Sequence, residues 1–287
     1  KHEIVSNYAV KFNIHDDVIN ILDKSMTIQV IEGWTVSIRP CEFQNFSEIF
    51  GRRMQISTSL SEYGELMKFL TEGKISLTEL VTCGQVYYDS VKATVTSRSQ
   101  AIKIFELLDE CRNIIIKTKP GANIIRYLLY NMNNRIIKEQ LYGEQCDRLE
   151  NLYLSYSCIP FDKMPYCTSL VRHNPRIYDL FESIPIDGRE HELFARFIKN
   201  NTETEGKLFT PKDDIQDFDD IDGLIRKYNG LLYYKHQNRR LESFEGHIYI
   251  KEYVEDSTEI IETIQKLSSS GIAHYTNSVD SWLTTDA

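Results

Sequence analysis

The chain has 287 residues and a formal net charge of −9, from 33 Lys and Arg residues against 42 Asp and Glu residues. This length fits one large domain or two modest ones, and 41% apolar with 26% charged residues is typical of a soluble globular protein. The excess of acidic residues excludes a uniformly basic nucleic-acid coat. The short apolar runs exclude a membrane span, and the scattered positions of the six cysteines exclude a disulfide framework. We therefore expect a cytoplasmic protein with reduced thiols and no membrane partner.

The N-terminal region begins with strand-like patterns and then becomes helical. Apolar residues alternate on both sides of Glu32-Gly33, which predicts a β-hairpin with its turn at that dipeptide. Residues 61–70 have helical spacing, and Gly73 supplies a stop signal.

Residues 86–117 predict a βαβ-like unit. Two short alternating stretches occupy residues 86–95, a helical pattern covers residues 101–108, and residues 113–117 predict a short strand. The order strand, helix, strand is typical of a crossover connection in a sheet. We therefore expect a mixed α/β region at the N-terminal end of the chain.

The C-terminal half is predicted to be mainly helical. Two short strands are expected at residues 231–234 and 247–250, and a following helix ends at Gly271.

A domain boundary is predicted just after Ser157. It separates a mixed α/β domain over residues 1–157 from a mainly helical region with short strands over residues 158–287. The predicted fold class is α/β (α+β), with a mixed-sheet N-terminal region, the βαβ-like unit and a small C-terminal strand pair.

Two basic segments stand out in this acidic chain. The first, residues 112–138, contains six basic residues and no carboxylate, and it runs through a predicted strand, a Pro-Gly turn and a helix start. Free N–H groups at a helix N-terminus attract anions. Lys117, Lys119 and Arg126 therefore predict contact with a phosphate, with Asn123 as a further donor. The alternative is a solvated helix face whose cations pair with the acidic C-terminal third.

The second basic segment, residues 226–240, interleaves cations with aromatic rings and again has no carboxylate. Its predicted nucleic-acid contacts are Arg226, Lys227, Tyr233, Lys235, Arg239 and Arg240. Aromatic faces between basic side chains suit stacking on unpaired bases while the cations contact phosphates. The alternative is an edge strand whose tyrosines pack inward and whose charges keep the edge soluble.

No complete catalytic or metal motif is present. Six Asp residues fall within residues 213–222, but counting back from Gly223 puts Phe218 where a calcium loop needs its first Asp. There is no Cys-x-x-Cys pair for zinc, and His191-Glu192 lacks the second His of a zinc protease. We predict no metal and no cofactor, and we interpret the acidic segment as helix capping within a solvated loop.

Two alternatives to nucleic-acid binding stay open. Asp89 with Lys92, and Glu245 with Lys251, loosely match the carboxylate and lysine of a metal-dependent nuclease, although neither pair has the standard spacing. The acidic residues 213–222 suit a protein–protein adaptor that docks on a basic partner, or an autoinhibitory segment that shields the basic ones.

Short stretches of the C-terminal half resemble a known family. They are residues 173–175 (HNP), 188–193 (GREHEL), 196–203 (RFIKNNTE), 228–229 (YN) and 233–236 (YYKH). Together, over roughly residues 158–275, they resemble the region that precedes the motor in bacterial superfamily-1 helicase-type ATP-binding proteins, some of which are associated with phage defence. The phosphate loop of the motor is absent from this sequence, so the resemblance implies no catalytic residue here.

The leading prediction is a nonmotor module of a larger intracellular nucleic-acid-processing protein, with a defence role implied by the resemblance. Such a module would bind nucleic acid through the two basic segments, or would position a neighbouring ATPase domain. Its partners would then be nucleic acid and a neighbouring domain or partner protein. The sequence leaves open whether the chain is an enzyme.

Overall fold

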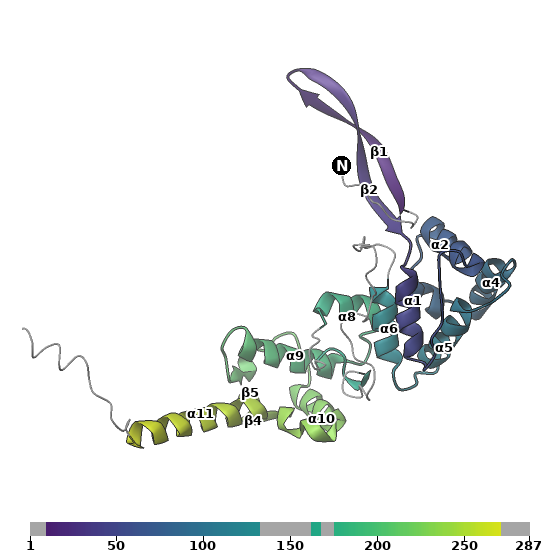
Figure 1. Cartoon of the computed structure of the whole chain (residues 1–287). Helices are drawn as coiled ribbons and strands as arrows, with labels where there is room; N and C mark the ends of the chain where they lie inside the picture. The colour runs from purple at the N-terminus through teal and green to yellow at the C-terminus, as the bar shows by residue number, and fades with distance from the viewer. Residues whose placement is uncertain (1–9, 133–161, 168–174, 271–287) are drawn as a thin grey trace, which may run out of the picture. The chain divides into compact units, whose positions relative to one another are not determined.

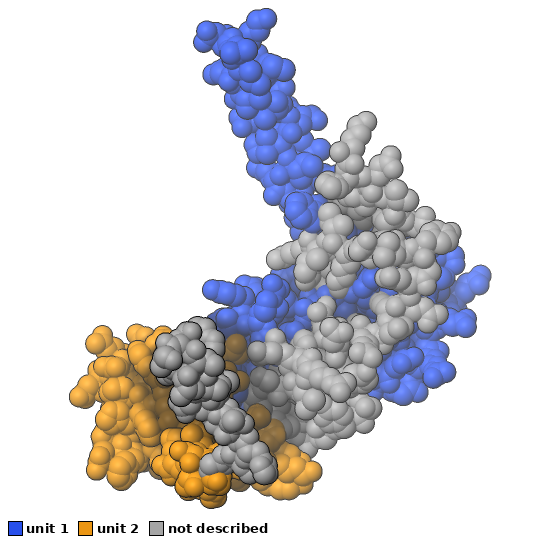
Figure 2. Space-filling view, turned by 60° about the vertical axis from the view of Figure 1, so that its left-hand side comes forward, with its two compact units in different colours: residues 1–187 blue, residues 188–287 orange. Residues whose placement is uncertain are grey.

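The computed structural model describes residues 10–132, 162–167 and 175–270. The chain divides into two compact units, Lys1–Asp187 and Gly188–Ala287, which Figure 2 shows in blue and orange. Both helices and strands are present, so the fold is mixed α/β, as the sequence predicts. The predicted boundary after Ser157 lies outside the described residues.

The first unit begins with a long two-stranded antiparallel ribbon, β1 (Val10–Ile21) and β2 (Lys24–Val36) (Figure 1). Its turn is formed by Leu22 and Asp23, whose φ angles are 48° and 61°. The predicted turn at Glu32-Gly33 is therefore wrong, and that dipeptide lies at a bulge where the strand register shifts. Mirror-image hairpin turns usually carry Asn-Gly or Asp-Gly, and Leu-Asp does not have that signature.

In the described residues of this unit, the remaining regular elements are helices, and their apolar faces form its core (Figure 1). They are α1 (Pro40–Glu48), α2 (Ser61–Gly73), α3 (Leu77–Thr82), α4 (Gln85–Thr96), α5 (Ile104–Ile116), α6 (Ala122–Asn131) and α8 (Ile177–Ser183). The predicted helix at residues 61–70 is confirmed as α2, which ends where Lys74 adopts a left-handed conformation. The ribbon is joined to this core where the Tyr63 hydroxyl donates to the carbonyl of Ile38, at 2.7 Å.

The predicted βαβ-like unit is wrong, because residues 86–95 belong to α4 and residues 113–116 belong to α5, with Lys117 as the C-cap. In α4 the buried side chains are Tyr88, Val91 and Val95, which have helical spacing and face the core. The β-branched run at residues 114–116 forms the last turn of α5, with Ile115 buried. Packing of an apolar helix face here outweighs the local preference of Val and Ile for strands.

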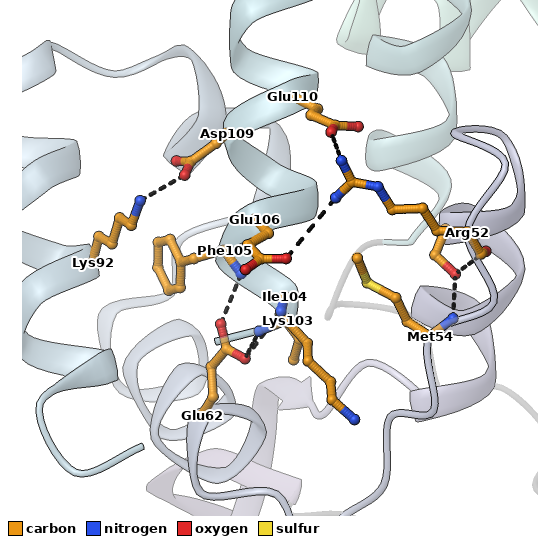
Figure 3. Close-up of polar contacts among 11 residues, drawn as sticks. Arg52, Met54, Glu62, Lys92, Lys103, Ile104, Phe105, Glu106, Asp109 and Glu110 are labelled. Atoms are coloured by element: carbon orange, nitrogen blue, oxygen red, sulfur yellow. Dashed lines mark hydrogen bonds and ion pairs between the residues drawn. The ribbon is translucent and has the colours of Figure 1, made fainter. Parts of the chain in front are cut away.

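A buried carboxylate from α2 caps the start of α5 (Figure 3). Glu62 is fully buried, and its Oε2 accepts hydrogen bonds from the N–H groups of Lys103 and Ile104 at 2.7 and 3.0 Å. Its Oε1 accepts from the N–H of Phe105 at 2.7 Å. The first-turn donors of α5, which have no partner within the helix, are thereby satisfied by a residue distant in sequence. The contact locks α2 against α5.

The second unit combines helices with a small antiparallel sheet of strand order β3-β5-β4. Its elements are α9 (Glu190–Glu203), β3 (Thr210–Pro211), η1 (Lys212–Asp214), α10 (Ile221–Leu231), η2 (Tyr234–Arg239), β4 (Leu241–Phe244), β5 (His247–Ile250) and α11 (Lys251–Ser270). The predicted strand at residues 247–250 is confirmed as β5, whereas residues 231–234 contain the end of α10 and the start of η2. β5 pairs on one side with β4, which follows η2, and on the other side with β3.

Candidate nucleic-acid interface

The nine residues predicted to contact nucleic acid are divided between the two units. Lys117, Lys119 and Arg126 belong to the first unit, and Arg226, Lys227, Tyr233, Lys235, Arg239 and Arg240 belong to the second. The two basic segments therefore have to be assessed as separate surfaces.

The predicted anion site at the start of α6 is already filled by a side chain of the protein. The backbone N–H of Asn123 donates to a carboxylate oxygen of Asp162 at 3.0 Å, and the Asn123 side-chain amide donates to the Asp162 carbonyl. Lys117 and Lys119 are exposed in the turn before this helix. The helix N-terminus attracts an anion, as expected, but the anion is the carboxylate of Asp162.

Arg112, the first cation of the same segment, is a structural residue. Its guanidinium is buried, donates to the carbonyl of Val81 at 2.6 Å and to Oε1 of Gln85 at 3.2 Å, and lies 4.7 Å from the centre of the Tyr88 ring. A guanidinium held on three sides in the interior cannot reach a phosphate. Arg112, which is one of the six basic residues of the segment but not one of its predicted contacts, is therefore not available to an external phosphate.

Arg126 lines a cavity of about 850 Å³ bounded by α3, α6 and α8. Its wall is formed by Ser76, Thr78, Glu79, Thr82, Arg126, Tyr130 and residues 181–187. Three carboxylates, those of Glu79, Glu182 and Asp187, face this space beside the one guanidinium. A polyanion would meet more negative than positive charge there, so the cavity does not extend a phosphate-binding surface.

The second basic segment forms a turn that is fixed between α10 and β4. The Tyr228 hydroxyl donates to the Arg239 carbonyl at 3.3 Å, and the Gln237 side chain donates to the Leu232 carbonyl at 3.3 Å. Asn229 exchanges two hydrogen bonds with the backbone of Leu241, at 2.8 and 2.9 Å. These contacts anchor the backbone of η2 to α10 and β4, so its exposed side chains project from an anchored turn.

Two tyrosines and a lysine form the exposed part of this turn. The Tyr234 ring is 70% exposed, its centre lies 4.5 Å from that of Tyr233, and the Lys235 ammonium lies 5.7 Å from the Tyr234 centre. His236 stands edge-on to Tyr233, and burial together with Arg239 lowers the pKa of its imidazole, so His236 adds no charge at neutral pH. The sequence predicts Tyr233 as the contact residue, but its neighbour Tyr234 is the more exposed of the two rings.

Some cations of this segment are exposed to solvent, whereas others are already bonded to groups of the chain. Arg226, Lys235 and Arg240 are exposed. Lys227 donates to the carbonyl of Gly188 at 2.9 Å, and Arg239 pairs with Glu252 at 3.3 Å. We define the "η2 surface" as Arg226, Tyr234, Lys235 and Arg240. Its members are one exposed ring and three exposed cations, of which Lys235 lies beside the ring.

The acidic residues 213–222 act partly as the sequence predicts. Asp220 caps α10 by accepting from the N–H of Gly223 at 3.1 Å. Asp222 pairs with Lys212 at 2.9 Å, and that ammonium, with Arg226 as a smaller influence, lowers the pKa of the Asp222 carboxyl.

The residues proposed for a nuclease do not lie on adjacent strands. Asp89 is on α4, where Gln85 donates to it at 2.9 Å, and Lys92 pairs with Asp109 at 2.6 Å. Glu245 occupies the turn between β4 and β5. Within the described residues, no group of three His, Cys, Asp or Glu side chains is arranged to hold a metal ion.

No protein-family model, curated protein or solved structure matches this chain. In the part of the chain that the structure describes, no helix combines the length and the apolar character that crossing a membrane requires.

Proposed function

We propose that this chain is a nonmotor module that binds single-stranded nucleic acid through the η2 surface. The observation that carries the proposal is the Tyr234 ring, which is 70% exposed and lies beside the Lys235 ammonium on a turn fixed by side-chain hydrogen bonds. An exposed ring flanked by cations lets a base stack while its phosphates are neutralised. Because every base has a π face, such binding is tolerant of sequence.

Because the whole chain carries a formal charge of −9, nucleic acid would bind only at a localised cationic surface. The contacts between its cations and phosphates make such binding sensitive to salt. Three available cations on the η2 surface correspond to a slope of about −2 in a plot of log affinity against log salt for a single strand. The resemblance of residues 158–275 to a region that precedes a helicase-type motor supports the same function, since such a motor acts on nucleic acid.

The test measures binding of a fluorescent oligothymidylate to the whole chain by anisotropy at low salt. We predict that Tyr234→Ala weakens binding by about fivefold to a hundredfold, because stacking contributes about 1–3 kcal/mol per base. Lys235→Glu should weaken binding and flatten the salt slope by about one unit.

Two controls separate the η2 surface from general effects. Tyr178→Ala removes another tyrosine that is 78% exposed, and Lys207→Glu makes the same charge change at a lysine paired with Glu205. Both should bind like the parent chain. Equal affinity of Tyr234→Ala and Tyr178→Ala would contradict the proposal.

A second candidate function, positioning a neighbouring domain or partner protein, is favoured by α11. Ile260, Ile261, Ile264 and Leu267 are 59, 55, 59 and 64% exposed, and they follow helical spacing along one stripe. While these side chains are exposed, they contribute little to the free energy of folding. Burial of each one against a partner would contribute roughly 1–2 kcal/mol to the free energy of binding. The stripe therefore suits docking to a protein surface.

A further inference from the structure

The β1–β2 ribbon exposes more apolar surface than a stable hairpin in water usually does. Eight of its apolar side chains are between 39 and 92% exposed: Phe12, Ile14, Val18, Ile21, Leu22, Met26, Ile31 and Trp34. An isolated two-stranded hairpin is marginally stable at best, and three or more strands are normally needed.

The two edges of the ribbon differ in how well they are protected against further pairing. The β1 edge carries Asp16 and Asp17 at its centre. In β2, residues 25–31 (SMTIQVI) contain no charge, no proline and no glycine. Natural edge strands are usually blunted by charges, proline or bulges, and an uncharged stretch rich in β-branched residues invites another strand.

We propose that the β2 edge pairs with β2 of a second copy of this chain, giving a continuous antiparallel sheet in the order β1-β2-β2-β1. Along a strand, every second residue directs its N–H and C=O groups to the same edge, so in an antiparallel pair of two β2 strands only residues with the same orientation can stand opposite each other. The two-fold axis that relates the two copies must therefore pass through a residue and not between two residues. An axis at Ile28 places Ile28 beside its own copy and Met26 beside Val30 of the partner subunit. The apolar residues of both faces then continue across the interface.

Charge selects this register. With the axis at Ile28, Lys24 comes opposite Glu32 of the partner subunit, at the bulge, and the symmetric pair repeats at the other end. Within its own chain Glu32 lies 3.1 Å from His15, so each Glu32 carboxylate would be shared between that imidazole and the Lys24 ammonium, and two such groups flank the uncharged stretch. Moving the axis by one residue in either direction separates both pairs. Direct pairing through the β1 edge would instead bring together strands that each carry Asp16 and Asp17.

The ribbon does not fit nucleic acid as its occupant. Residues 10–36 contain Lys11 and Lys24 against Asp16, Asp17, Asp23 and Glu32, so their net charge is −2. Ribbons that enter a nucleic-acid groove need cations to neutralise phosphates. The pairing proposed here is independent of the η2 surface, so either proposal can fail without the other.

Sedimentation equilibrium of the whole chain tests the pairing. We expect a concentration-dependent dimer, weakened about tenfold by Lys24→Glu and by Glu32→Lys, because each change places two like-charged pairs across the interface. The double variant Lys24→Glu with Glu32→Lys restores opposite charges and should dimerise like the parent chain. Circular dichroism confirms that each variant keeps its fold.

Cysteine cross-linking tests the register itself. In the proposed pairing Ile28 lies about 4.5–5.5 Å from its copy between Cα atoms, within disulfide reach, whereas Gln29 faces Thr27 of the partner subunit. Under mild oxidation Ile28→Cys should give a covalent dimer and Gln29→Cys should not. A chain that stays monomeric at all concentrations, or equal cross-linking of both variants, would overturn the proposal.

Discussion

The carboxylate of Glu62 accepts hydrogen bonds from three successive backbone N–H groups at the start of α5. Removing it would leave these donors without a partner in the interior, at a cost of roughly 1–3 kcal/mol for a buried group left unpaired. We predict that Glu62→Ala lowers the free energy of unfolding by about 3 kcal/mol or more, as measured by urea denaturation.

An exposed helix cap provides the comparison. Ser76 caps α3 by accepting from the N–H of Glu79 at 3.1 Å, in a position open to water. Because water can replace this acceptor, Ser76→Ala should cost only about 1 kcal/mol. Losses of equal size at the two positions would show that burial of the Glu62 carboxylate has no special effect.

The environment of single residues could not be predicted from the sequence. Arg112 and Lys117 belong to one run of cations, and only the fold distinguishes the buried guanidinium from the exposed ammonium. Asn123 was predicted as an anion donor, and it does contact a carboxylate, that of Asp162. Residue type indicated the chemistry in that case, but it could not indicate that the anion belongs to the chain.

At the scale of elements, long periodic segments could be predicted and short apolar runs could not. α2 has clear helical spacing and a stop signal, and it forms as predicted. The Val-rich and Ile-rich parts of α4 and α5 have local preferences for strands, and their helical state depends on neighbours that are distant in sequence. The hairpin turn at Leu22-Asp23 lacks the usual turn residues, so the sequence does not predict it, and both sides of the predicted turn at Glu32-Gly33 belong to the single strand β2.

The helix α11 gives a prediction at this scale. Its contacts with the rest of the second unit are made near its start, where Glu252 pairs with Arg239 and the Tyr253 hydroxyl donates to Glu203, while residues 258–270 are all exposed. A helix without tertiary packing is only marginally stable in water. In hydrogen-exchange mass spectrometry we expect the amides of residues 258–270 to exchange much faster than those of α9. Equal protection would mean that the apolar stripe is already covered in solution.

The chain comprises two compact units, and in each of them a buried ionisable side chain affects the stability of the unit. In the first unit that group is Glu62, whose hydrogen bonds are complete. In the second it is His191, which is 3% exposed and whose two ring nitrogens have no hydrogen-bond partner within the described residues. Burial, together with the charges of Lys227 and Arg189, lowers the pKa of His191 from 6.5 to about 4.

Acid should therefore destabilise the second unit before the first. The folded-state pKa of His191 lies below its unfolded value of 6.5, so its contribution is fully present above pH 6.5 and is lost as the pH falls toward about 4. Between pH 7 and pH 5 this linkage corresponds to roughly 2 kcal/mol. We predict that protection of α9 amides, corrected for intrinsic exchange rates, falls over this range while that of α5 does not. His191→Leu should remove this loss of protection, and the control variant His15→Gln, at an exposed position, should keep it. An unchanged pH response in His191→Leu would assign the acid sensitivity to other groups.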